Sequence, residues 1–86
     1  MSNYVVEFTK SAQKELNKLP GQISLRIAKA VDKLSLDPRK GNVRPMVGSK
    51  SWRLRVGDYR IIYDIYDKKL IVLIIRVRHR TNVYRD

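Results

Sequence analysis

The 86-residue sequence contains no cysteine and only one histidine. Without cysteine there is no disulfide framework and no zinc site with thiolate ligands, and one histidine supplies too few ring nitrogens for a transition-metal site. We therefore expect neither a metal nor a cofactor. The lack of cysteine also fits a protein of the reducing cytoplasm, where disulfides rarely persist.

Long apolar segments are missing as well. The longest apolar run, residues 70–75, has six residues, whereas a membrane-spanning helix needs about 18 or more. Residues 1–6 lack the basic stretch and the apolar run of a signal peptide. We therefore expect no membrane association, and we interpret the apolar run as a buried strand.

Acidic residues are scarce, since eight Asp and Glu stand against 19 Lys and Arg, which gives a formal net charge of +11. A field of this size attracts polyanions, so nucleic acid is the first expected partner. Net charge alone does not separate RNA from DNA or from an acidic protein. A chain of this length builds only one core, so residues 1–86 should form a single, marginally stable domain.

Hydrophobic periodicity in the first half predicts a strand followed by two helices. A β-rich segment at residues 4–8 ends at Thr9, which is a good helix N-cap. Apolar residues spaced by three or four positions predict one helix that stops before Pro20 and a second over residues 23–34, ending before Pro38. The short connection between these two helices, residues 20–22, favours a helix hairpin.

In the second half the period changes to two. Residues 39–51 hold glycine, proline and basic residues, which is typical of a loop. Strands are predicted over residues 52–56, 59–66 and 70–80, with turns between them. The order is β-α-α-β-β-β, an α+β fold in which the helix hairpin packs on one face of a small, mostly antiparallel sheet. The other face is then free for function.

Strand alternation directs many basic residues away from the predicted core. Arg53 and Arg55 alternate with apolar residues, and the arginines of residues 76–80 share one parity. Guanidinium groups suit phosphate oxygens and stack on bases, so the cluster indicates RNA binding, with solvated strand residues as the alternative. The residues expected to bind RNA are Arg39, Lys40, Arg44, Lys50, Arg76, Arg78 and Arg85.

Several short motifs together resemble the RelE/ParE toxin superfamily. They are Ser51-Trp52-Arg53-Leu54-Arg55, then Gly57-Asp58-Tyr59-Arg60-Ile61-Ile62-Tyr63, and finally His79-Arg80 leading to Val83-Tyr84. Residues 8–12 and 16–19 are also similar to the family. The order and spacing of the motifs cover nearly the whole chain, so the resemblance implies one RelE-like toxin domain.

The resemblance implies an mRNA endoribonuclease that acts on the ribosome and needs no metal. In this chemistry a ribose 2′-OH attacks its own 3′-phosphate and leaves a 2′,3′-cyclic phosphate. In RelE toxins a basic strand pair, two further arginines and a C-terminal tyrosine surround the scissile phosphate, and another branch adds a histidine acid. By that match the predicted catalytic residues are Arg53, Arg55, Arg60, Arg80, Tyr84 and His79.

This chain departs from the family in its basic strand pair and in lacking one glutamate. The strand residues Arg53 and Arg55 are often lysines in the family, and arginine keeps the charge but can hardly transfer a proton. The glutamate that partners the histidine in the other branch has no counterpart here. Regular alternation also turns His79 away from its neighbouring arginines, so an orienting or stacking role for His79 stays open.

The resemblance also implies an acidic antitoxin of the RelB type as a partner. Two other functions remain open: a ParE-like protein that inhibits DNA gyrase by binding, and an RNA-binding module without catalysis. The joint presence of four matched arginines and Tyr84 favours the ribonuclease.

Overall fold

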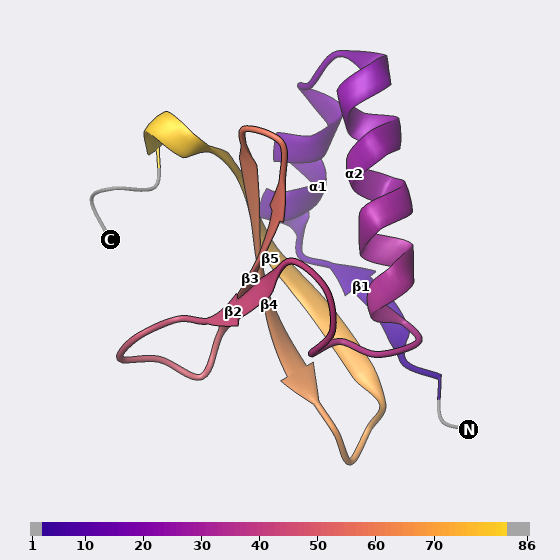
Figure 1. Ribbon diagram of the computed structural model, residues 1–86. Helices are drawn as coiled ribbons and strands as arrows, with labels where there is room; N and C mark the ends of the chain where they lie inside the picture. Colours follow the sequence, from indigo (N-terminus) through magenta and orange to yellow (C-terminus); the bar gives the residue numbers. More distant parts are fainter. Residues whose placement is uncertain (1–2, 83–86) are drawn as a thin grey trace.

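The computed structural model describes residues 3–82, which form a five-stranded sheet with both helices on one side of it (Figure 1). The elements are β1 (Val5–Phe8), α1 (Lys10–Asn17), α2 (Gly21–Leu34), β2 (Val43–Pro45), β3 (Trp52–Val56), β4 (Tyr59–Tyr66), β5 (Ile71–His79) and a 3₁₀ turn (Arg80–Asn82). The predicted α+β class and the placement of both helices on one face are confirmed. Within residues 3–82 neither helix has the length and apolar character needed to cross a membrane.

One strand was not predicted. β2 lies inside residues 39–51, whose glycine, proline and basic residues predict a loop, and it pairs antiparallel with β3. It has only three residues and ends in Pro45, so it is too short to show a period of two. The bounds of β3 and β4 are those expected from alternation.

The sheet has the strand order β1-β5-β4-β3-β2. β1 is parallel to β5, and all the other pairs are antiparallel, which confirms a mostly antiparallel sheet. The first and last strands therefore lie side by side, although they are far apart in the sequence. α1 and α2 separate β1 from the rest of the sheet in chain order and cover one of its faces (Figure 1).

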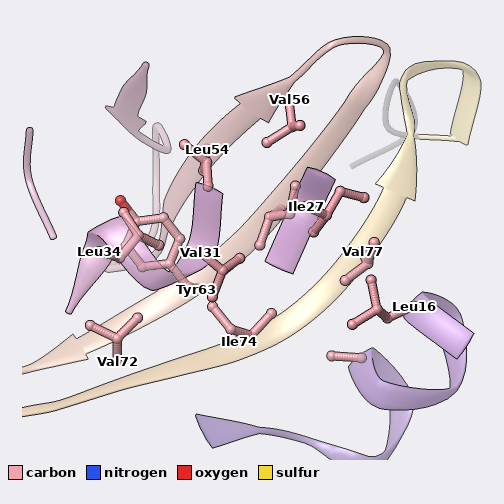
Figure 2. Close-up of a cluster of buried hydrophobic side chains, with 12 residues drawn as sticks. Leu16, Ile27, Val31, Leu34, Leu54, Val56, Tyr63, Val72, Ile74 and Val77 are labelled. Atoms are coloured by element: carbon pink, nitrogen blue, oxygen red, sulfur yellow. The ribbon is translucent and has the colours of Figure 1, made fainter. Parts of the chain in front are cut away.

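The core lies between the helices and one face of the sheet, as Figure 2 shows. Its helical residues repeat every three or four positions, so they form one stripe on each helix. Its strand residues alternate along β3 and β4, so they come from one face of the sheet. The buried members are Ala12, Leu16, Ile27, Val31, Leu34, Leu54, Val56, Ile61, Tyr63, Val72, Ile74 and Val77.

β5 contains a β-bulge at Ile75. Ile62 of β4 pairs with Arg76, whereas the next residue of β4, Tyr63, pairs with Ile74. One residue of β5, Ile75, is therefore extra and has no partner on β4.

The bulge reverses which side chains of β5 face the helices. Ile74 is fully buried in the core, and in a regular strand Arg76 and Arg78 would point to the same face as Ile74. Beyond the extra residue it is Val77 that enters the core. The bulge thus sends the two arginines to the open face of the sheet.

Thr9 and Glu15 bind the backbone of β5 at this bulge and on either side of it. The Thr9 N–H donates to the Ile74 carbonyl (2.9 Å) and the Thr9 hydroxyl donates to the Ile75 carbonyl (3.2 Å). The same hydroxyl oxygen accepts from the Ala12 N–H (3.1 Å) and so caps α1. The Glu15 carboxylate accepts from the Val77 N–H (2.9 Å). Thr9 and α1 therefore replace β1 as the hydrogen-bonding partners of β5.

Thr9→Val should destabilise the fold by about 1–2 kcal/mol, because it removes the helix cap and leaves a part-buried carbonyl of the bulge without its donor. Thr9→Ser keeps the hydroxyl and should lie within about 0.5 kcal/mol of the parent. Urea unfolding of the three proteins gives the comparison. The midpoints are compared directly if the measured m-values of the three agree. Equal midpoints for Thr9→Val and the parent would contradict the role of this hydroxyl.

Candidate functional site

The open face of the sheet carries arginines that are direct neighbours across strands. In one row Arg55 of β3 pairs with Arg60 of β4, and Arg60 pairs with Arg78 of β5. Since residues paired in this way have Cβ atoms about 5 Å apart, three guanidinium-bearing side chains leave the sheet side by side.

A second row lies next to the first and crosses four strands. Arg44 of β2 pairs with Arg53 of β3, which pairs with Ile62 of β4, and Ile62 pairs with Arg76 of β5. Ile62 is only 8% exposed although it is not on the helix side. The aliphatic stems of the flanking arginines account for this burial, because long cationic side chains cover apolar surface while their charged ends stay in water. We call the two rows together the arginine face.

Two adjoining cavities are hollowed into this face. The larger, of about 520 Å³, is lined by Arg44, Arg53, Arg55 and Arg60 together with residues 41–43. The smaller, of about 230 Å³, is lined by Arg55, Arg60 and Arg80 together with residues 57–59. Arg55 and Arg60 line both cavities, which therefore adjoin, and we call the two together the arginine groove.

Arg80 reaches the groove although it follows the end of β5. The 3₁₀ turn begins at this residue, and its backbone N–H donates to the Asp58 carbonyl in the β3–β4 turn (2.7 Å). This bond holds Arg80 beside Arg55 and Arg60. The structure thus brings together Arg53, Arg55, Arg60 and Arg80, the four arginines predicted as catalytic. Such a cluster can bind and stabilise a phosphate, whereas its permanently protonated guanidinium groups cannot accept a proton.

His79 is not brought into the groove. Beyond the bulge the odd-numbered residues of β5 face the helices, and the His79 ring packs edge-on against Tyr59, with ring centroids 5.1 Å apart. Its Nδ1 lies 3.0 Å from the Thr81 hydroxyl oxygen and accepts the Thr81 N–H (3.3 Å). His79 lines a separate cavity with Glu15 and Lys18.

The remaining basic residues predicted to bind RNA are divided between the groove, the arginine face and the loops beside β2. Arg44 lines it, and Arg76 occupies the arginine face. Arg78 is on the same face, with its Nε 3.7 Å from a carboxylate oxygen of Glu15. Lys40 and Lys50 are exposed in the loops on either side of β2. Tyr84 and Arg85 lie outside the described residues.

Arg39 takes part in a separate ionic cluster. Its guanidinium makes two hydrogen bonds to the Asp67 carboxylate (3.1 and 2.8 Å) and lies 5.9 Å from the centre of the Trp52 ring. The Tyr4 hydroxyl donates to the same carboxylate (2.7 Å). The cluster ties the β4–β5 turn to the start of β1 and to the loop after α2. It is not part of the groove.

Two groove residues, Asn42 and Asp58, were not singled out from the sequence. The available signal was the turn chemistry of Gly41-Asn42 and Gly57-Asp58, where a polar side chain sits next to a glycine. Both of these glycines have positive φ angles, of 96° and 58°. Within residues 3–82 no three His, Asp or Glu side chains gather where they could hold a metal ion.

The ionic cluster predicts a pH-dependent contribution to stability. The hydrogen bond from Arg39, followed by that from Tyr4, lowers the pKa of Asp67. A lowered folded-state pKa means that the contact stabilises the fold above the unfolded pKa of about 3.9 and that this contribution is lost as the pH falls through the folded value. Because the groups are exposed, the effect should be small and weakened by salt.

We therefore expect the parent to exceed Asp67→Asn in free energy of unfolding at neutral pH, and the difference to shrink as the pH falls below about 4. Denaturant unfolding at a series of pH values measures it. Asp32→Asn is the control, because Asp32 is exposed and its carboxylate forms no salt bridge within residues 3–82. A difference between parent and Asp67→Asn that does not vary with pH would refute this assignment.

Comparison with known proteins gives concordant matches over nearly the whole chain. Residues 6–84 match the family model described as the ParE toxin of type II toxin-antitoxin system, parDE. Toxin RelG of Mycobacterium tuberculosis is 37% identical over 84 residues, which cover 95% of this chain and 97% of that protein. The mRNA interferase toxin RelE of Escherichia coli is 30% identical over 87 residues, which cover 96% and 92%.

Solved structures share the same architecture. A chain of the toxin–antitoxin complex RelBE2 from Mycobacterium tuberculosis superposes with a TM-score of 0.83 at 33% identity, covering 91% of this chain and 99% of that one. The archaeal RelE–RelB complex from Pyrococcus horikoshii gives a TM-score of 0.80 at 29% identity, with coverages of 94% and 99%. The chain therefore belongs to the RelE-type toxins of the RelE/ParE toxin–antitoxin superfamily.

Proposed function

We propose that this protein is an endoribonuclease toxin that cuts messenger RNA on the translating ribosome. The observation that carries the proposal is the arginine groove, in which arginines from β3, β4 and the 3₁₀ turn line two adjoining cavities. Such a groove suits a phosphodiester, because guanidinium groups donate paired hydrogen bonds to phosphate oxygens. The relative named mRNA interferase toxin RelE supports the choice of messenger RNA.

The proposed reaction is attack by a ribose 2′-OH on the adjacent 3′-phosphate. A bond forms between the 2′-oxygen and phosphorus, and the bond from phosphorus to the 5′-oxygen of the next nucleotide breaks. The 2′-OH loses one proton and the leaving 5′-oxygen gains one, which gives a 2′,3′-cyclic phosphate and a free 5′-OH. Neither water nor a metal ion enters this balance.

In this scheme Arg60 and Arg80 bind the non-bridging phosphate oxygens, where negative charge builds up in the pentavalent transition state. Arg53 and Arg55 bind the flanking backbone or the leaving oxygen. The strand pairing fixes the backbone positions of Arg53, Arg55 and Arg60 before the substrate arrives, and donors positioned in advance supply much of the rate in charge-stabilising enzymes.

Proton transfer needs a residue other than these arginines. We assign the base to Tyr84, which follows Arg80 by four positions in the sequence. The scheme requires the Tyr84 phenol to approach the arginines when RNA binds, where positive charge would favour its ionised form. The alternative role for Tyr84 is a platform on which a base stacks. His79, which faces the helices, is left out of the scheme.

Incubation with translating ribosomes, followed by mapping of the message ends, tests the proposal against its rivals. Internal cuts that carry 2′,3′-cyclic phosphate ends are the expected result. A ParE-like protein, which the matched family model makes the main alternative, would inhibit supercoiling by gyrase and leave the message intact. A non-catalytic RNA-binding module would retard RNA in a binding assay, but it would neither cut the message nor inhibit gyrase.

Arg80→Ala and, separately, Tyr84→Phe should each slow cleavage by about 10²–10³-fold, the usual effect of losing one transition-state contact. Lys29→Ala is the matched control, since it also removes one exposed positive charge but from α2, on the other side of the sheet. Its cleavage rate should stay within about twofold of the parent, because isolated surface charges contribute little. Parent-like rates in both site variants would make the assigned site untenable.

We also propose an acidic antitoxin as the partner that holds the protein inactive. The arginine face and the net charge of +11 offer a binding surface for a flexible acidic segment. Apolar burial where the helices meet the sheet would add to the charge relief and offset the cost of ordering that segment. The structural relatives are RelE–RelB complexes, which supports this choice of partner.

The affinity for this antitoxin should fall as salt rises but persist in part, because charge and apolar contacts both contribute. Binding to RNA, which depends mainly on phosphates, should fall more steeply over the same range. The experiment purifies the protein from its host at low salt, identifies the acidic protein that co-elutes, and titrates both ligands at several salt concentrations. Recovery of the free protein alone, with no acidic protein encoded beside its gene, would count decisively against the antitoxin.

A further inference from the structure

A tight turn centred on Asn42 forms one wall of the larger cavity of the groove. The Val43 N–H donates to the Gly41 carbonyl (2.8 Å), a bond between residues i and i+2 that defines a γ-turn. The Asn42 carbonyl accepts from the Arg55 N–H (3.0 Å). The backbone of Asn42 is therefore fixed beside an arginine of the groove.

The Asn42 side chain remains available to a ligand. It is exposed, and its amide makes no hydrogen bond with any residue of the segment 3–82. The other polar side chains that line this cavity are arginines. A guanidinium group only donates hydrogen bonds, whereas a primary amide both donates and accepts. Asn42 is thus the one side chain of this lining that can accept a hydrogen bond from a neutral donor.

We propose that Asn42 is a specificity-determining residue that recognises the base of the nucleotide in this cavity, and that the base is adenine. The inference rests on the proposed function. The amide oxygen accepts from the adenine N6 amino group while the amide nitrogen donates to a ring nitrogen, so two hydrogen bonds form at once. The arginines cannot accept from an amino group and instead bind phosphates or the acceptor edge of guanine.

The size of the cavity is consistent with this role. Its volume of about 520 Å³ falls in the usual range of about 300–1,000 Å³ for small-molecule sites. Proteins that recognise RNA sequence mostly bind unpaired bases splayed out of the strand, whose edges are open to side chains. A base held by Asn42 would leave its phosphate beside Arg53 and Arg55, which line the same cavity.

The first test maps cleavage sites in a message library for the parent, Asn42→Ala and Asn42→Asp. We expect adenine to be enriched at one fixed position next to the cut in the parent, and this enrichment to fall by roughly tenfold in Asn42→Ala. Asn42→Asp should shift the preference towards cytosine, because a carboxylate accepts from the cytosine amino group. Asn17→Ala, at the end of α1, is the matched control and should keep the parent map.

The second test measures binding without cleavage, using short 2′-O-methyl oligomers of adenine, cytosine, guanine or uracil. The parent should prefer the adenine oligomer, and Asn42→Ala should lose this preference while keeping the parent's melting temperature. A parent without adenine preference, or an Asn42→Ala variant that retains it, overturns the inference. If no protein cuts RNA but the adenine preference still depends on Asn42, the base site stands and the ribonuclease proposal falls.

Discussion

The contact of Thr9 and α1 with the bulged part of β5 is the constraint on which the site depends. β1 ends at Phe8, so the backbone of β5 beyond this point needs other hydrogen-bonding partners. Thr9 supplies two of them and Glu15 a third. With these partners in place the extra residue Ile75 is accommodated, and the second half of β5 presents arginine to the open face.

Two acidic side chains of this basic protein form salt bridges within residues 3–82, and neither pairs with an arginine that lines the groove. Asp67 pairs with Arg39 at the end of the sheet away from the groove, and Glu15 lies against Arg78 at its edge. Arg53 and Arg55 form no salt bridge within residues 3–82. Adjacent like charges repel one another, and a polyanion relieves that repulsion when it binds. The arrangement therefore links the stability of the arginine face to its proposed ligands, RNA and an acidic antitoxin.

The neutral amide of Asn42 can distinguish between bases, which the arginines of the groove do not do when they bind phosphates. Arginines that bind phosphate give affinity that is largely independent of sequence. Discrimination between bases needs donors and acceptors that match a base edge, and Asn42 brings both to the cavity. The division between phosphate-binding arginines and a base-reading amide follows from what each side chain can donate or accept.

The sequence by itself determined the α+β class, both helices, the bounds of β3 and β4, and the placement of Arg53 and Arg55 on the face opposite the core, because these follow from local periodicity and charge. Only the tertiary structure decided the short strand β2, the parallel pairing of β1 with β5, and the placement of Arg39 outside the groove, whereas alternation along β5 already turned His79 away from its neighbouring arginines. Only the tertiary structure also decided the bulge at Ile75, which reverses the side chains of β5 that face the helices. A bulge there depends on hydrogen bonds from Thr9, 66 positions away from Ile75, and alternation within one strand carries no information about a partner so distant in the chain.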